Sequence, residues 1–108
     1  MMETYTPGEI VLLLFPFVNT ISVKRRPAII LVDTGDEDII VARITTQNNQ
    51  TKFDVPIKDW NMIGLLLPSY VRIHKIATIE KNLVEKRLGK TTDDDWKQIK
   101  DIIHFLWK

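Results

Sequence analysis

Four side chains of this sequence could act together on a phosphate ester: Arg26, Thr45, Arg72 and His74. Cleavage of RNA without a metal needs a proton removed from the 2′-hydroxyl, stabilisation of the crowded phosphate, and a proton for the leaving 5′-oxygen. The planar fork of an arginine binds two phosphate oxygens and stays charged. A histidine transfers protons near neutral pH, and a threonine hydroxyl can hydrogen-bond a phosphate or a 2′-hydroxyl. These residues would provide all three functions if the ends of their strands meet.

Basic residues near these positions could contact a nucleic-acid backbone. The net charge of +1 gives no bulk attraction for nucleic acid, but residues 23–26 carry three cations and no anion. Residues 69–90 carry six basic residues against two acidic ones. Such local patches can hold a short RNA segment, although a solvated surface is the simpler interpretation of charge alone. The candidate RNA-binding residues are Lys24, Arg25, Arg43, Thr46 and Lys75.

The sequence gives little support to other kinds of site. Without cysteine there is no disulfide and no thiolate chemistry, and His74 and His104 lie far apart without companion ligands, so we expect no metal site. No glycine-rich phosphate loop is present, and no cofactor is expected. A Ser-His-Asp triad is not excluded by sequence, but no nucleophile-elbow motif supports one.

Short apolar runs separated by turn residues predict the strands that would carry these side chains. Pro27 cannot donate a ladder hydrogen bond, so we place it at the start of a strand or on an edge. Alternation puts Arg43 and Thr45 on one face of their strand, and it puts Arg72 and His74 together on theirs. Residues 19–22 are expected to form a loop. The predicted strands are Ile10–Phe17, Ala28–Val32, Ile39–Thr45, Phe53–Ile57 and Tyr70–Ile76.

The C-terminal segment has the pattern of a capped amphipathic helix. Thr92 is the expected N-cap, with Asp95 completing a capping-box pattern. A shorter helical turn is expected at residues 58–64, closed by Gly64. The stripe predicted to face the sheet is Trp96, Ile99, Ile102, Ile103 and Leu106. These elements predict a mainly β fold: a five- or six-stranded, mostly antiparallel sheet or small barrel with one docked C-terminal helix.

Length and composition are those of an ordinary globular domain. The 108 residues, 44% of them hydrophobic and 27% charged, suit one domain over residues 1–108. The longest apolar run, at residues 10–17, is shorter than the roughly 18 residues that cross a bilayer. No N-terminal signal pattern is present. We therefore expect a cytoplasmic protein without a membrane partner.

The order of these motifs resembles the MazF/PemK family of toxin–antitoxin toxins over roughly residues 8–107. An apolar run and a polar loop precede Arg26-Pro27, and the arginine of this pair is catalytic in the family. Ile44-Thr45 matches the apolar-Thr pair at the family's active site. Residues 71–74, Val-Arg-Ile-His, match a Val-Arg-x-Asp segment whose arginine is also catalytic, so His74 replaces an acidic proton-transfer residue. The loop before Arg25 is shorter than in many members and lacks their glycines.

The resemblance implies a small SH3-like barrel and a metal-independent endoribonuclease that cleaves single-stranded RNA, in particular mRNA. It implies attack by the 2′-hydroxyl, leaving a 2′,3′-cyclic phosphate and a 5′-hydroxyl. It also implies a homodimer and a cognate antitoxin whose acidic, partly disordered tail lies in the substrate groove. Arg26 and Arg72 would stabilise the transition state, Thr45 would position the substrate, and His74 would transfer a proton.

Other interpretations remain open at this point. The ending at residues 104–108, His-Phe-Leu-Trp-Lys, loosely resembles the aromatic tail of gyrase-poisoning toxins of this architecture, which bind a protein and do not cleave RNA. The replacement at His74 is also compatible with an inactive homologue that only binds RNA or a partner. Arg72 could simply pair with Asp54 or Asp59. The tryptophans are more typical of core or interface anchors than of base-stacking platforms, and Trp107 could pack across a dimer interface.

Overall fold

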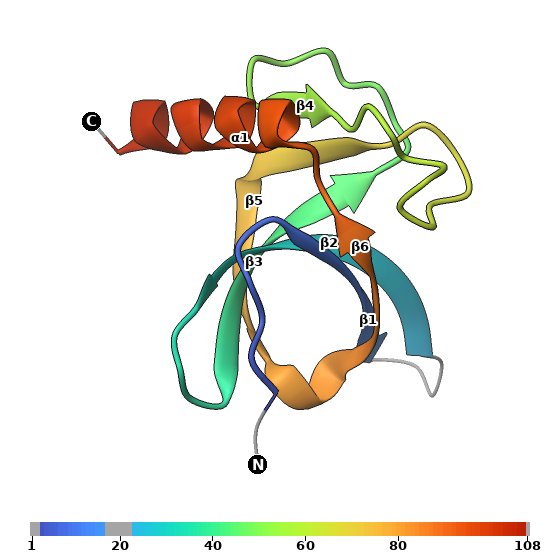
Figure 1. Ribbon diagram of the computed structural model, residues 1–108, viewed down its shortest axis with the longest axis vertical. Helices are drawn as coiled ribbons and strands as arrows, with labels where there is room; N and C mark the ends of the chain where they lie inside the picture. Colours follow the sequence, from blue (N-terminus) through green and yellow to red (C-terminus); the bar gives the residue numbers. More distant parts are fainter. Residues whose placement is uncertain (1–2, 17–22, 108) are drawn as a thin grey trace.

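A six-stranded antiparallel sheet and one helix make up the fold (Figure 1). The computed structural model describes residues 3–16 and 23–107. The strand order is β4-β5-β3-β2-β1-β6. In chain order the elements are β1 (Glu9–Pro16), β2 (Val23–Asp33), β3 (Asp38–Thr45), β4 (Asp54–Pro56), β5 (Tyr70–Glu80), the 3₁₀ turn η1 (Lys81–Leu83), β6 (Val84–Lys90) and α1 (Asp93–Leu106). The sheet curls into a small barrel that η1 closes from β5 to β6 (Figure 1). The predicted mainly β class with a C-terminal helix is confirmed.

The two faces of the sheet bury two separate hydrophobic clusters. On β2, Ile29 and Leu31 enter the first cluster while Ala28 and Ile30 enter the second, as strand alternation requires. The first cluster lies between the sheet and α1, and all five residues of the predicted helix stripe belong to it or pack against it. The second cluster fills the barrel and includes Tyr5 from the N-terminal segment. This division fixes which side chains can reach which surface.

The prediction for the second strand was wrong at its start. β2 begins at Val23, five residues before Ala28, and Pro27 lies inside it opposite Leu12 of β1. The pairs with β3 reach only to Ala28, so the earlier part of β2 has no partner on that side among the described residues. A residue without an N–H is tolerated at such an edge. Phe17 and the predicted loop at residues 19–22 lie outside the described residues.

β6 was not predicted from the sequence. Its residues include four charges and Gly89, a composition that lacks the alternation of a half-buried strand. It pairs with β1, but the register shifts twice along the ladder. Ile63 belongs to the loop between β4 and β5, which crosses β6 at Gly89. A Cβ at Gly89 would come within 3.1 Å of a methyl carbon of Ile63, so the strand needs glycine there.

β5 changes direction between Ile76 and Arg72. Along the ladder with β3, Ala42 pairs with Ile76 while the next residue, Arg43, pairs with Arg72. One step along β3 therefore corresponds to four steps along β5, and the strand turns sharply there (Figure 1). The amide of Ile73 instead donates to the carbonyl of Phe53, in the segment before β4, at 2.9 Å. The bend lets one strand serve both the barrel and the layer under α1.

The capping of α1 follows only half of the predicted pattern. The backbone N–H of Asp95 donates to the Thr92 hydroxyl at 3.1 Å, so the N-cap is confirmed. The Asp95 carboxylate does not complete a capping box. It is fully buried and accepts from the amide of Lys58 at 2.9 Å, which ties α1 to the loop after β4. Within the described part of the chain, no helix is long and apolar enough to cross a membrane.

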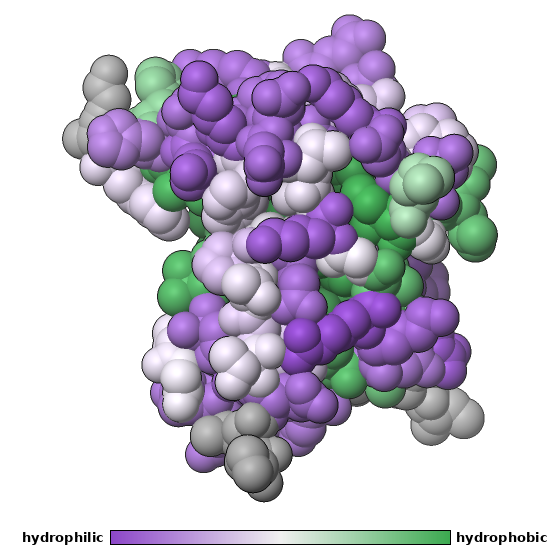
Figure 2. All heavy atoms as spheres, in the orientation of Figure 1, coloured by the Kyte–Doolittle hydropathy of each residue, from purple (hydrophilic) through white to green (hydrophobic). Residues whose placement is uncertain are grey.

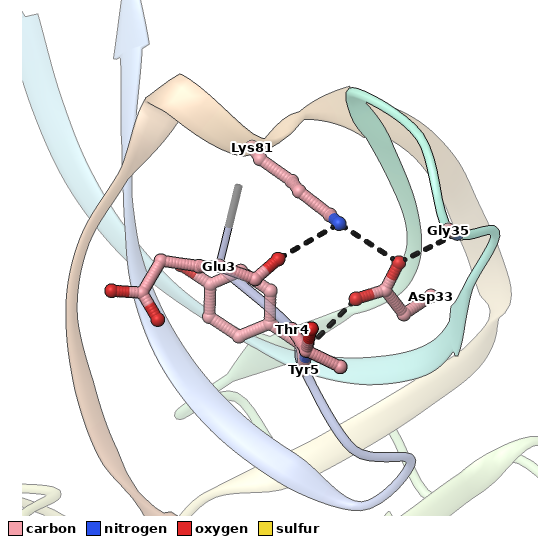
Figure 3. Close-up of a pocket in the computed structure, with 6 residues that line it drawn as sticks. All are labelled: Glu3, Thr4, Tyr5, Asp33, Gly35 and Lys81. Carbon is pink, nitrogen blue, oxygen red and sulfur yellow. Dashed lines mark hydrogen bonds and ion pairs between the residues drawn. The ribbon is translucent and has the colours of Figure 1, made fainter. Parts of the chain in front are cut away.

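A hollow of about 370 Å³ marks where the N-terminal segment closes the barrel (Figure 3). Asp33 and Lys81 form an ion pair of 3.0 Å there, and both side chains are at least nine-tenths buried. Asp33 also accepts from the amides of Tyr5 and Gly35, each at 2.8 Å, and Lys81 donates to the carbonyl of Glu3 at 2.9 Å. The polar groups of this hollow therefore bond to each other, and they fasten residues 3–5 to the barrel.

The Asp33 carboxylate should make the stability of the fold fall at acid pH. The hydrogen bonds from Tyr5 and Gly35, followed by Lys81, outweigh burial and lower the pKa of Asp33 from 3.8 to about 2. A carboxylate with a lowered pKa stabilises the fold above pH 3.8, and this contribution is lost as the pH falls toward 2. We expect Asp33→Asn to lower the free energy of unfolding by about 2 kcal/mol at pH 7.

Urea unfolding at pH 7, and at several values between pH 4 and pH 2, measures both effects. Glu80→Gln is the control, because Glu80 is exposed and has no ion pair with the described residues. Equal stability of Asp33→Asn and wild type, or the same loss of stability with acid in both, would contradict this role of Asp33.

Candidate functional site

Most of the residues selected from the sequence lie at one end of the sheet, where β2 separates from β3 while β5 stays paired with β3. β2 and β3 are paired as far as Ala28 and Arg43, and beyond that point the two strands separate (Figure 1). Alternation places Arg26 and Arg43 on the face of the second cluster, beyond its apolar residues. We call this surface the arginine end; its residues are Arg26, Arg43, Thr45, Arg72 and His74.

Arg43 and Arg72 face each other across the ladder between β3 and β5. Directly opposite residues on antiparallel strands have Cβ atoms about 5 Å apart on the same face, so two guanidinium groups share this surface. Asp54 of β4 is in turn directly opposite Arg72. The sheet register therefore sets a row of two cations and one anion across three strands.

Arg72 is held by two hydrogen bonds. Its Nε donates to Oδ1 of Asp54 at 3.0 Å, and its Nη2 contacts Nε2 of His74 at 3.3 Å. The pairing with Asp54 was one of the two acidic partners considered from the sequence, and the structure selects it over Asp59. A guanidinium has five N–H donors, so three of those of Arg72 are not used by these two bonds.

Asp54 is a buried carboxylate whose two oxygens are both occupied. Its side chain is 3% exposed, and Oδ2 accepts from the hydroxyl of Thr51 at 2.6 Å and from the Thr51 amide at 3.2 Å. Burial acts to raise the pKa of Asp54, but the hydrogen bonds from Thr51 and the contact with Arg72 outweigh it and lower the pKa. Asp54 is therefore a fixed negative charge next to Arg72.

The contact with Arg72 determines which ring nitrogen of His74 carries the hydrogen. A guanidinium can only donate, so Nε2 of His74 must present its lone pair and Nδ1 carries the proton. Nδ1 is buried and has no hydrogen-bond partner among the described residues. The Phe53 ring packs against the imidazole with centroids 5.2 Å apart. The histidine therefore offers a basic nitrogen on the side that faces Arg72.

Arg26 and Thr45 belong to the diverging strands. The Arg26 side chain is half-buried and makes no ion pair or side-chain hydrogen bond with residues 3–16 and 23–107. A half-buried guanidinium without an anion is suited to bind one. Thr45 ends β3, where its hydroxyl accepts from the amide of Gln47 at 3.1 Å.

The structure distributes the candidate RNA-binding residues unevenly. Lys24 alternates onto the same face as Arg26, and Arg43 belongs to the arginine end. Arg25 points to the opposite face and pairs with Glu85 of β6 at 2.7 Å, so the structure does not bring it to the other candidates. Thr46 follows β3 and is exposed, as is Lys75 at the bend in β5.

Two contributors to this site were not selected as functional from the sequence, Thr51 and Phe53, and Asp54 was considered only as a partner for Arg72. All three lie in or next to the polar loop after β3, whose composition indicates only an exposed connection. The spacing Thr51-x-x-Asp54 is a local signal, because a carboxylate three residues after a threonine can accept from its hydroxyl and amide. Their approach to β5 depends on long-range pairing that no local pattern shows.

Two exposed apolar sites are formed by residues outside the arginine end. The first is the loop between β4 and β5, where Met62, Leu66 and Leu67 are exposed, and it appears hydrophobic at the right edge of Figure 2. The second is the end of α1, where Phe105 is half-exposed and Trp107 is 69% exposed. Among the described residues there is no group of three or more histidine, cysteine or acidic side chains that could hold a metal.

Comparison with known proteins agrees with this arrangement. The sequence profile of the family described as "PemK-like, MazF-like toxin of type II toxin-antitoxin system" matches residues 6–106. No curated protein matches the chain.

Many solved structures share its fold, including the following three. MazF (Form-I) from Deinococcus radiodurans has a TM-score of 0.76 at 16% identity, with 97% of each chain covered. The Mycobacterium tuberculosis toxin MazF-mt6 has a TM-score of 0.70 at 21% identity, covering 88% of this chain and 93% of that one. An endoribonuclease in complex with its cognate antitoxin, from Mycobacterial species, has a TM-score of 0.71 at 18% identity, covering 90% and 88%.

The ring state of His74 can be tested without any assay of function. In neutral His74 we expect the proton on Nδ1, because Arg72 donates to Nε2. Replacing Arg72 by methionine should release Nε2 and shift the proton toward it. Long-range ¹H–¹⁵N correlation spectra at pH 8 distinguish the two forms, and the exposed His104 is the internal reference. A wild-type His74 protonated on Nε2 would show that the contact with Arg72 does not exist in solution.

Proposed function

The chain belongs to the PemK/MazF family of toxins of type II toxin–antitoxin systems, and from this we propose that it is a metal-independent endoribonuclease that cleaves single-stranded RNA. One observation carries the proposal: the sheet register places Arg43 opposite both Arg72 and Ala28, Arg26 lies two residues before Ala28 on β2, and His74 contacts Arg72. These are the groups that phosphate cleavage needs, at one end of one face. The proposed substrate is mRNA.

The proposed reaction is transesterification inside the RNA chain. The ribose 2′-oxygen bonds to phosphorus, and the bond from phosphorus to the 5′-oxygen breaks. The products are a 2′,3′-cyclic phosphate and a 5′-hydroxyl, and the proton lost by the 2′-hydroxyl is balanced by the proton gained by the leaving 5′-oxygen. The negative charge that collects on the phosphate is the part that a protein stabilises most effectively with fixed donors.

Each side chain of the site has a role that matches its environment. Arg26 has no competing anion among the described residues, and Arg72 keeps three unused N–H groups, so both can bind phosphate oxygens. His74 transfers the proton through Nε2, which is released when the Nη2 hydrogen that it accepts is drawn to a phosphate oxygen, while Nε of Arg72 stays on Asp54. Thr45 positions the substrate where β2 and β3 separate. A histidine therefore takes the role that an acidic residue has in the related motif.

A cognate antitoxin and a homodimer complete the proposal. One structure of the same fold is an endoribonuclease in complex with its cognate antitoxin. An acidic, partly disordered tail suits the cations of the arginine end, where it would occupy the phosphate positions of the substrate. The proposed dimer would place the substrate groove near its two-fold axis.

A second candidate function is toxicity through protein binding without cleavage. The observation that favours it is the exposure of the C-terminal aromatic residues. Trp107 follows the end of α1 and is 69% exposed, so it contributes little to the core. A large exposed aromatic side chain is a common anchor in protein interfaces.

The proposed role of Arg26 predicts a large loss of rate. We expect Arg26→Ala to cut single-stranded RNA about 10²-fold more slowly, because one donor to the transition state is removed. Lys86→Ala is the matched control, since Lys86 is an exposed cation of β6 and should change the rate little. A folded Arg26→Ala variant that cleaves at the wild-type rate would exclude the assignment.

Trp107→Ala separates the two candidate functions. The ribonuclease proposal predicts unchanged cleavage and unchanged growth inhibition, because Trp107 lies outside the arginine end. Toxicity through protein binding predicts instead that growth inhibition is lost while urea unfolding shows an intact fold. Two measurements decide between them: growth after induced expression of the variant, and the stability of the purified variant in urea.

A further inference from the structure

We propose that Asp54, held in place by Thr51, is the positioning residue for Arg72. This inference rests on the proposed function, because its consequence is the rate of RNA cleavage. It assigns a role to a buried carboxylate that the reaction described above does not use. The Asp54 side chain is 3% exposed and the Arg72 side chain is 21% exposed, so the pair is largely shielded from solvent.

The position of Asp54 is fixed from both sides. The sheet register sets it directly opposite Arg72 on the neighbouring strand. Its Oδ2 accepts two bonds from Thr51, which leaves Oδ1 directed at Nε of Arg72 at 3.0 Å. A carboxylate that cannot rotate away from these bonds holds Arg72 in one orientation. A catalytic guanidinium requires such preorganisation.

A repulsion at the arginine end explains why Arg72 needs this partner. Arg43 lies directly opposite Arg72 on the other side and forms no ion pair with the described residues, and like charges at such positions destabilise a sheet. Without Asp54, Arg72 would be displaced from Arg43 toward solvent. Asp54 offsets the repulsion and at the same time occupies Nε, so that both hydrogens of Nη1 and one of Nη2 remain for a phosphate.

Proton transfer by Asp54 is a poorer interpretation. Both of its oxygens accept hydrogen bonds from protein groups, and its pKa is lowered, so it is a weak base. It reaches the reaction only through Arg72. The neighbouring residue Phe53 packs on His74, so the segment that carries Asp54 supports both members of the Arg72–His74 pair.

A double-mutant cycle tests this role. Asp54→Asn should lower kcat by about 10²-fold with a smaller change in KM, because a displaced guanidinium fails mainly in the transition state. In the Arg72→Ala background, the same change should have no further effect. Thr51→Val keeps the carboxylate and should lower kcat less. Asp59→Asn, in the exposed loop after β4, is the control and should cleave as wild type.

An NMR measurement tests the same inference without cleavage. The Nε–H of Arg72 should exchange slowly with water in the wild type, and exchange should become fast in Asp54→Asn. Full activity of Asp54→Asn, an equal loss in the Arg72→Ala background, or unchanged protection of the Arg72 Nε–H would each overturn the inference. A wild-type protein that leaves RNA intact would contradict the proposed function alone, because slow exchange lost in Asp54→Asn would still support the positioning of Arg72.

Discussion

The bend in β5 is the constraint on which the rest of this structure depends. Because the ladder with β3 jumps from Ile76 to Arg72 in a single step along β3, one strand changes direction while it remains paired. Beyond the bend, β5 closes the barrel; before it, β5 pairs with β4 and lies under α1 (Figure 1). The same irregularity leaves His74 outside the ladder next to Arg72. The Arg72–His74 pair therefore lies where β5 passes from the layer under α1 to the barrel.

Strand alternation explains why much of this fold could be predicted from sequence. Along β3, Ile39 and Val41 belong to one hydrophobic cluster while Ala42 and Ile44 belong to the other, as alternation predicts, and the helix stripe is confirmed in full. β6 has no such pattern. Its residues are mostly charged, so its sequence does not indicate that it pairs with β1. The early start of β2 was also missed. Proline usually marks the end of a strand, and it lies inside β2 only because the pairing with β3 stops at Ala28.

The site was predictable to the extent that its residues lie on strands. The positions of Arg26, Thr45, Arg72 and His74 at one end of the sheet follow from alternation and the pairing of three neighbouring strands. Arg25 shows the limit of this reasoning, because it neighbours Arg26 in sequence but points to the other face and pairs with Glu85. The position of Asp54 depends on the pairing of a three-residue strand, and no local signal sets that pairing.

Mapping of RNA ends tests the central claim most directly. Purified protein is incubated with a long single-stranded RNA in EDTA, and the cut sites and their end groups are determined. The account predicts discrete cuts with 2′,3′-cyclic phosphate and 5′-hydroxyl ends, because the 2′-hydroxyl is the attacking group and protein side chains supply the chemistry. Intact RNA in the presence of folded protein, or ends that carry a 5′-phosphate, would contradict it.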